Sequence, residues 1–197
     1  KSTFFIFKMS TAFLICFVRL VRGWPNVEWE TNATLGSKPN NLTTLAVEIA
    51  ISTARVVRLF GFDPKVAFVS HSTFGQPLTS RTKHIRNAVD ILKEKNVDFE
   101  FDGDMQPDVA LNPEYQELYP FSNIVGKANI LIMPALHSAA ISTKLMKSFG
   151  GAKLIGPLLI GLDLPIEVAP LRSSTSDILN LASIAAYSAD VIDYNKD

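Results

Sequence analysis

Cysteine is almost absent from this chain, which carries Cys16 as its single cysteine among 197 residues. One cysteine cannot form a disulfide within the chain, and no cluster of Cys and His shows the spacing of metal ligands. We therefore expect no internal disulfide and no structural zinc. Because disulfides are rare in reducing compartments and the chain does not depend on them, the composition favours a cytoplasmic location.

An excess of charge of either sign is absent as well. Nineteen acidic and nineteen basic residues cancel to a formal net charge of zero. Proteins that bind nucleic acid through its backbone need a broad positive field, so we expect no nucleic-acid partner. Local recognition of a single phosphate group stays open, because it needs only a few well-placed donors.

Long apolar runs are also missing. The apolar stretch from Ala12 to Val18 is far shorter than the ~20 residues that a membrane-spanning helix needs, and charged residues flank it on both sides. The residues that follow it do not form the small-residue cleavage site of a secretory signal peptide. We therefore expect neither a membrane span nor a secretion signal.

From Leu42 onward the chain alternates between helical and strand patterns. Helical spacing of apolar residues occurs over 45–57, 85–92, 139–149 and 178–185, and short apolar runs typical of buried strands occur at 66–69, 99–101, 129–133 and 153–160. Gly61 is placed to cap the first helix. Strands separated by helices of about 10–15 residues predict an α/β fold with a largely parallel sheet covered by helices on both faces.

The segment from Phe7 to Asn40 does not fit this alternation. It is rich in Trp, Pro, Asn and Gly, and the strand-like run Thr3–Ile6 precedes it. We interpret residues 1–41 as a strand remnant followed by an irregular insertion, and residues 42–197 as the folded domain. Long irregular loops are uncommon in compact domains, so this insertion is expected either to pack at a specific place or to be mobile.

Four short motifs follow one another in the second half of the chain. They are DGDMQPD at 102–108, NILIMP at 129–134, GPLLIG at 156–161 and STSDI at 174–178. In this order they resemble the phosphate acetyltransferase family, which moves an acetyl group between coenzyme A and phosphate. The resemblance runs from about Thr43 to the end. It implies the isocitrate/isopropylmalate dehydrogenase-like fold of phosphotransacetylases, with an incomplete first lobe.

One further stretch narrows the resemblance. The sequence PALHSAAISTK at 134–144 is similar to the phosphotransacetylase-like C-terminal domain of bacterial NADP-dependent malic enzymes. Active acetyltransferases tend to have Asp, Asn and Asn at the positions of Ala135, His137 and Ala140. The resemblance therefore implies a branch of the family in which acetyl-coenzyme A binds this domain and inhibits a malate-oxidising domain elsewhere. The Gly-x-Gly-x-x-Gly fingerprint of nicotinamide binding is absent here.

The resemblance implies that Asp177 takes the proton from the coenzyme A thiol. A carboxyl pKa of about 4 and a thiol pKa of about 8.5 differ by roughly 6 kcal/mol, so this role requires a raised carboxyl pKa or a stabilised thiolate. A second interpretation is open. Ser174 and Asp177 have the spacing of a capping box, in which the helix dipole lowers the carboxyl pKa instead.

The chain departs from the family beside this carboxylate. Active relatives have a Ser-Arg pair where this chain has Pro170 and Leu171, and Arg172 comes one place later. A shift of one residue on an extended strand turns a side chain to the opposite face, so Arg172 is a candidate catalytic cation only if it reaches back. Most of the first lobe and its arginines are also missing. These departures disfavour turnover by this chain alone.

A ligand-binding loop is the better-supported candidate. The sequence SHSTFG at 70–75 follows a predicted strand, and we single out Ser70, Ser72, Thr73 and Gly75. Their hydroxyls and backbone amides suit a phosphate or the pantetheine end of coenzyme A. The resemblance implies that Gln106 faces the same cleft. In the alternative interpretation, this is a turn whose Ser and Thr side chains satisfy the neighbouring backbone.

The remaining polar groups favour structural roles. His71 and His137 each stand alone, with no other histidine or cysteine nearby in the sequence. A lone histidine more often forms a structural hydrogen bond than acts as a catalytic base. Asp102, Asp104 and Asp108 are expected in a loop after a strand, but they lack the Gly and terminal Glu of a calcium loop. We expect no metal site and no tightly bound cofactor.

The resemblance therefore implies an acetyl-coenzyme A- or coenzyme A-binding domain of the phosphate acetyltransferase family, the regulatory part of an NADP-dependent malic enzyme with weak or no turnover. The expected partners are coenzyme A or its acetyl ester, phosphate, a second copy of the chain in a homodimer, and a malic enzyme catalytic domain. Two alternatives stay open. The chain is either an active acyltransferase with Asp177 as base, or a degenerate fragment with a structural or oligomerisation role.

Overall fold

The computed structural model describes residues 14–15, 40–149, 155–159 and 164–194. The elements in chain order are β1 (Leu14–Ile15), α1 (Asn40–Leu59), β2 (Lys65–Val69), α2 (Ser80–Glu94), β3 (Glu100–Met105), α3 (Pro107–Leu111), α4 (Pro113–Gln116), β4 (Ile130–Ile132), α5 (Leu136–Phe149) and α6 (Thr175–Tyr194). The strand expected over Thr3–Ile6 lies outside the described residues. So does the expected insertion, apart from β1 and the start of α1.

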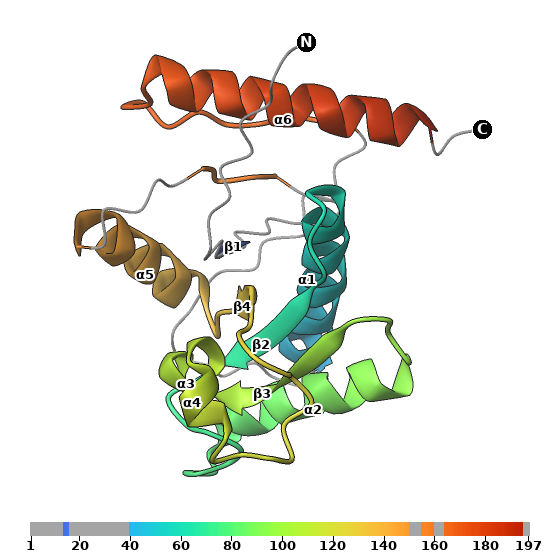
Figure 1. Ribbon diagram of the computed structural model, residues 1–197, viewed down its shortest axis with the longest axis vertical. Coiled ribbons are helices and arrows are strands. Elements are labelled where there is room, and N and C mark those ends of the chain that lie inside the picture. The colour runs from blue at the N-terminus through green and yellow to red at the C-terminus, as the bar shows by residue number, and fades with distance from the viewer. Residues whose placement is uncertain (1–13, 16–39, 150–154, 160–163, 195–197) are drawn as a thin grey trace.

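Four strands form one sheet in the order β1-β4-β2-β3, and every pair in it is parallel. Val66 of β2 lies between Phe101 of β3 and Ile130 of β4, and Leu14 of β1 pairs with Ile130 from the other side. Parallel strands require long crossover connections, and helices supply these connections between β2, β3 and β4 (Figure 1). The α/β fold with a parallel sheet is therefore confirmed.

The two faces of the sheet pack against different helices. Val66 and Phe68 of β2 point into a core with α1 and α2, whereas Ala67 and Val69 point into a second core with α3. Successive residues of a strand face opposite sides, so a strand buried on both faces reads as a continuous apolar run. This explains why the run at 66–69 identified β2 so clearly.

Local capping sets the ends of α1 and α2. At the end of α1, Gly61 has φ +81°, the Gly61 amide donates to the Arg58 carbonyl at 2.8 Å, and the Phe62 amide donates to the Val57 carbonyl at 3.2 Å. This pattern is a Schellman motif and confirms the predicted cap. At the start of α2, Thr79 and Thr82 form a capping box.

Two expectations about strands are wrong. Asp102 and Asp104 lie inside β3 with buried side chains, not in a loop after the strand, because β3 continues four residues beyond Phe101 to Met105. In the region expected to form a strand over 153–160, the described residues Ile155–Leu159 form no strand. Within the described parts of the chain, no neighbouring strand pairs with their backbone.

The last helix lies apart from the sheet. Figure 1 shows α6 crossing the end of the molecule farthest from α2, α3 and α4. One contact to α1 is made by the Tyr187 hydroxyl, which donates to the carbonyl of Leu59 at 3.2 Å. No helix among the described residues is both long and apolar enough to cross a membrane.

Candidate ligand site at the carboxyl end of the sheet

The loop after β2 and the end of β3 lie side by side at the carboxyl edge of the sheet. The Ser70 amide donates to the Met105 carbonyl at 2.9 Å, and the Phe74 amide donates to the Asp104 carbonyl at 2.6 Å. Because β2 and β3 are parallel neighbours, their following loops leave the sheet at the same edge. The structure thus brings the 70–75 loop and Gln106 together.

The side chain of Asp104 forms hydrogen bonds with this loop. Its side chain is fully buried, and it accepts hydrogen bonds from the Ser72 hydroxyl and, at 3.1 Å, from the Gly75 amide. The pairing of β2 and β3 shifts by one residue between Phe68 and Val69, so Asp104 is the extra residue of a bulge. Bulges redirect side chains, and here the bulge accompanies a carboxylate that faces the loop.

Gly103 makes that bulge possible. It has φ +154°, and a Cβ atom built on it would lie 2.7 Å from the Cβ of Phe68 and 2.8 Å from the Phe68 carbonyl oxygen. Real Cβ atoms do not approach other atoms so closely, and the nearest groups include backbone that cannot move aside. A glycine is therefore required between the two aspartates.

Gln106 forms hydrogen bonds with Thr73 and with a second residue of the loop. The Gln106 amide donates to Thr73 Oγ1 at 3.2 Å, and Gln106 Nε2 donates to the His71 carbonyl at 2.8 Å. Ser72 and Thr73 are buried, whereas the His71 side chain is exposed. The predicted hydroxyls are thus engaged within the protein, as in a self-satisfied turn. Of the residues in these contacts, His71 is exposed and Gln106 is partly exposed.

The other two aspartates of the DGDMQPD motif serve different neighbours. Asp102 accepts from the Asn123 amide at 2.7 Å, from Asn123 Nδ2 at 3.1 Å and from the Gly103 amide at 2.9 Å. Asp108 is exposed in the first turn of α3. Each of the two buried aspartates therefore fixes one loop. Across the described ranges, no group of three or more His, Cys, Asp or Glu residues is placed to hold a metal ion.

Asp177 forms the capping box that its spacing with Ser174 indicated. Its carboxylate accepts from the Ser174 amide at 3.0 Å and the Ser174 hydroxyl at 2.8 Å, and the Asp177 amide donates back to the Ser174 hydroxyl at 3.2 Å. Arg172 is exposed in the turn before α6. Because α6 lies across the far end of the molecule, Asp177 and the 70–75 loop are not brought together (Figure 1).

Comparison with known proteins places this geometry in a family. The profile described as phosphate acetyl/butaryl transferase matches residues 31–186. This chain belongs to that family. The matched range includes the 70–75 loop, both buried aspartates of β3 and the capping box of α6, so the whole candidate site lies within the phosphate acetyl/butaryl transferase region.

Relatives and solved structures agree with this assignment. The chain is 49% identical over 142 residues to an NADP-dependent malic enzyme from Rhizobium meliloti, covering 72% of this chain and 19% of that protein. It is 37% identical over 153 residues to a phosphate acetyltransferase from Clostridium acetobutylicum, covering 77% and 46%. A phosphotransacetylase structure from Streptococcus pyogenes superimposes with a TM-score of 0.70 at 36% identity, covering 75% and 45%. The chain thus spans a fifth of the malic enzyme and under half of the acetyltransferase.

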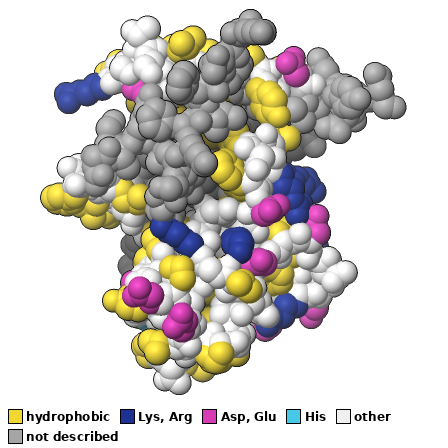
Figure 2. Space-filling model, in the orientation of Figure 1, with side chains coloured by type: hydrophobic (Ala, Val, Ile, Leu, Met, Phe, Trp, Pro, Cys, Tyr) yellow, Lys and Arg dark blue, Asp and Glu magenta, His cyan; other side chains and the backbone are white. Residues whose placement is uncertain are grey.

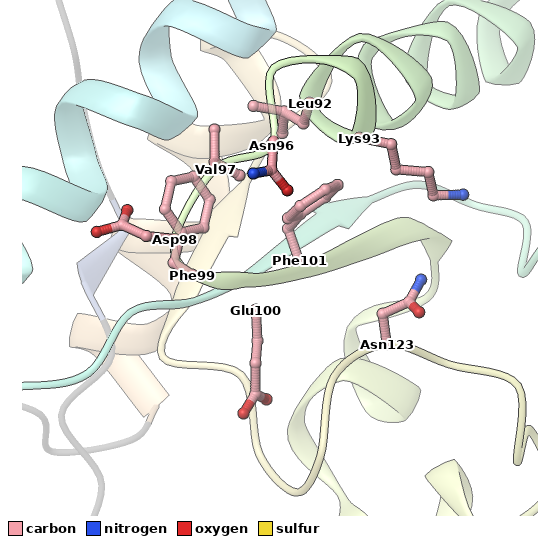
Figure 3. A pocket seen from close by; sticks show the side chains of 9 residues that line it. All are labelled: Leu92, Lys93, Asn96, Val97, Asp98, Phe99, Glu100, Phe101 and Asn123. Carbon is pink, nitrogen blue, oxygen red and sulfur yellow. The ribbon is translucent and has the colours of Figure 1, made fainter.

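Two hollows of this transferase-family domain were not anticipated from the sequence. One lies beside the start of β3, has a volume of about 570 Å³ and is lined by Leu92, Phe99 and Phe101, among others. Figure 3 shows Phe99 and Phe101 on the α2 side of the strand, with Glu100 on the other side. Glu100 is paired with Lys65 at 3.2 Å, so this carboxylate at the hollow already has a partner.

The second hollow adjoins the candidate loop itself. It is a groove of about 670 Å³ between the 74–78 segment and α2, and it contains Lys83 and Arg86. The sequence signal was available, because Lys83, Arg86 and Asp90 recur at intervals of three and four residues and so lie along one face of α2. This signal was not recognised, because charged residues on one face of an amphipathic helix ordinarily indicate only a solvent-exposed face.

Proposed function

We propose that this chain is a coenzyme A- or acetyl-coenzyme A-binding domain that acts as the regulatory part of an NADP-dependent malic enzyme, with little or no acetyl transfer of its own. Family membership supports the ligand class, because the family's reaction uses coenzyme A and phosphate. The 49% identity with a malic enzyme supports the branch. No tightly bound cofactor is part of this proposal.

The observation that carries the proposal is the prepared loop at the carboxyl edge of the sheet. The helix after β2 packs on one face of the sheet and the helix after β3 packs on the other, so the two connections diverge at this edge. In open α/β sheets, ligands bind outside the carboxyl ends of strands where connections diverge. Buried Asp104 holds the 70–75 loop there through two hydrogen bonds within the protein, and a loop that is held in place loses less entropy on binding.

The surroundings of Asp177 support binding in preference to turnover. Its carboxylate accepts two hydrogen bonds from Ser174 and so takes part in capping α6. Pro170 and Leu171 stand where active relatives have a Ser-Arg pair, and Leu171 is fully exposed. Electrostatic positioning by several cations is the usual source of catalysis at such sites, and Arg172 alone does not supply it.

The proposed partners follow from the same role. Acetyl-coenzyme A is the effector, phosphate competes for its anionic contacts, and the response is transmitted to a malate-oxidising domain. A homodimer in the cytoplasm is the proposed setting. The malic-enzyme and acetyltransferase relatives are much longer than the match, so the complete regulatory output belongs to an assembly larger than the described domain.

Calorimetric titration of the folded chain with acetyl-coenzyme A, with and without phosphate, tests the proposal. We expect saturable binding that phosphate weakens, and no coenzyme A-dependent consumption of acetyl phosphate. Gln106→Ala should weaken binding about 5- to 10-fold, because it frees the His71 carbonyl and loosens the loop. Lys95→Ala, an exposed change at the opposite end of α2, should leave binding unchanged.

Two other outcomes would change the assignment. Acetyl transfer that disappears in Asp177→Asn would mean that the chain is an active acyltransferase. A folded sample that shows neither binding nor transfer would leave a structural or oligomerisation role. The folded state should be verified by near-ultraviolet circular dichroism before either conclusion is drawn.

A further inference from the structure

The groove between the 74–78 segment and α2 is open to solvent and large enough to admit a small molecule. Its volume of about 670 Å³ lies within the range of ligand pockets, about 300–1,000 Å³. Phe74 and Leu78 contribute apolar surface on the loop side, and Lys83 and Arg86 contribute two positive charges from α2. Leu78 is 58% exposed, so part of this apolar surface is open to solvent.

The two cations of the groove lie close together without a partner among the described residues. Lys83 and Arg86 are three residues apart on α2 and therefore share one face of the helix. Neither side chain forms an ion pair or hydrogen bond within the described parts of the chain, whereas Asp90 at the same groove pairs with Lys93 at 3.8 Å. Like charges at this spacing repel slightly, and an anion bound between them would remove that cost.

One cation of the groove lies close to the candidate loop at Gly75. It has φ +84°, and a Cβ atom built on it would lie 2.6 Å from Arg86 Nη1. A side chain at this position would displace the guanidinium from its place beside the loop backbone. The Gly75 amide in turn donates to buried Asp104 at 3.1 Å. Arg86 and the candidate ligand loop are therefore in contact through one glycine.

We propose that this groove binds the phosphoryl groups of a nucleotide, with Lys83 and Arg86 as the anion-binding residues. Arginine presents several donors that match phosphate oxygens in pairs, and lysine adds a mobile point charge. The exposed surface of Phe74 and Leu78 suits the apolar face of a base. Phe74 is held for this role by a tilted contact with Tyr119 at 5.4 Å and an edge contact with Phe121 at 4.8 Å between ring centroids.

The nucleotide is assigned as the 3′-phosphoadenosine diphosphate end of coenzyme A, and this part of the inference rests on the proposed function. Gly75 belongs to both the groove and the loop, so one extended ligand can contact Arg86 and the loop at the same time. Recognition of phosphoryl groups by Lys83 and Arg86 does not depend on that assignment.

The test is calorimetric titration of the full chain with three probes: coenzyme A, dephospho-coenzyme A and inorganic pyrophosphate. We expect Lys83→Gln and Arg86→Gln each to weaken coenzyme A binding about 10-fold. Dephospho-coenzyme A should bind the unchanged chain more weakly than coenzyme A does, and the two substitutions should reduce its affinity by a smaller factor. Arg81→Gln is the matched control. It removes the same charge from the same helix, but its position is turned well away from the groove face, so binding should be unchanged.

The three probes separate the possible failures. If coenzyme A binds and the groove variants behave like Arg81→Gln, the groove inference is overturned and the proposed function stands. If coenzyme A does not bind but pyrophosphate does, and Lys83→Gln and Arg86→Gln abolish that binding, the groove stands as a phosphoryl site and the proposed function falls. If a folded sample binds none of the three, both are overturned.

Discussion

Asp104 is the single residue on which the candidate loop most depends. Its buried carboxylate satisfies both the Ser72 hydroxyl and the Gly75 amide. Removing one partner of a buried hydrogen bond leaves the other group with no hydrogen-bond partner in the protein or in water, at a cost of about 1–3 kcal/mol for each group. We expect Asp104→Ala to lower the free energy of unfolding by about 3 kcal/mol, measured by urea denaturation followed by circular dichroism.

Asp108→Ala is the control for that measurement. Asp108 comes from the same motif but is exposed in the first turn of α3, where a carboxylate contributes at most about 1 kcal/mol through the helix dipole. Similar losses in the two variants would contradict the assigned role of Asp104.

Glu167 gives the protein a pH dependence that can be assigned to one group. Burial raises the pKa of this carboxyl above its ordinary value, and the hydrogen bond from the Leu159 amide at 3.2 Å opposes the rise. A carboxyl with a raised pKa binds more protons folded than unfolded between its two pKa values. The free energy of unfolding should therefore fall as the pH rises through that window.

The Glu167→Gln variant should lose this slope, since an amide does not titrate. Its carbonyl oxygen can still accept from Leu159. Urea denaturation at several values between about pH 4 and pH 7 measures the difference. Exposed Glu114→Gln serves as the comparison, and a slope that persists in Glu167→Gln would show that another group causes it.

Among the elements, α1 ends at a residue in the left-handed backbone conformation. Gly61 has φ +81°, and a Cβ atom there would meet nothing within 4 Å. The cost of Gly61→Ala is therefore conformational only, about 1 kcal/mol. Gly103→Ala combines an unfavourable φ with a clash against Phe68 and should cost considerably more. Thermal and urea unfolding of the two variants measure the contrast, and equal losses would contradict it.

The elements that the sequence predicted correctly are those with strong periodicity. Ala88, Val89 and Leu92 repeat at helical spacing, and all three are buried in α2. The second half of β3 was missed because Asp102, Gly103 and Asp104 have the composition of a loop. They form a strand because Asn123 and Ser72, distant in sequence, satisfy the carboxylates. No local pattern reveals partners that the fold supplies.

At the scale of the whole molecule, apolar side chains remain exposed on the outer helices. On α5 these are Ile141, Leu145 and Phe149, spaced four residues apart and so on one stripe, with Phe149 84% exposed. Figure 2 shows hydrophobic side chains at the surface in this region and along α6. Exposed stripes of this kind mark interaction surfaces. The homodimer predicted from the family resemblance would have a suitable contact here.

We expect Leu145→Glu to shift the chain from dimer to monomer, because a charge buried in such a contact would be left unpaired. Sedimentation velocity over a range of concentrations measures this. Leu118→Glu is the matched control, since Leu118 is 72% exposed beyond α4 and outside the stripe. A monomeric wild-type chain, or the same shift in both variants, would contradict the assignment of this surface.

The sequence by itself determined the α/β class, most of the elements and the family, because these depend on periodicity, local spacing and motif order. It offered the capping box of Asp177 as one of two interpretations. Tertiary structure decided which polar atoms of the 70–75 loop form hydrogen bonds within the protein, since the Ser72 hydroxyl donates to Asp104, 32 residues away in the chain. It also decided that Asp177 lies away from the loop and that Arg86 lies against Gly75. These relations depend on distances through space, which the order of residues does not contain.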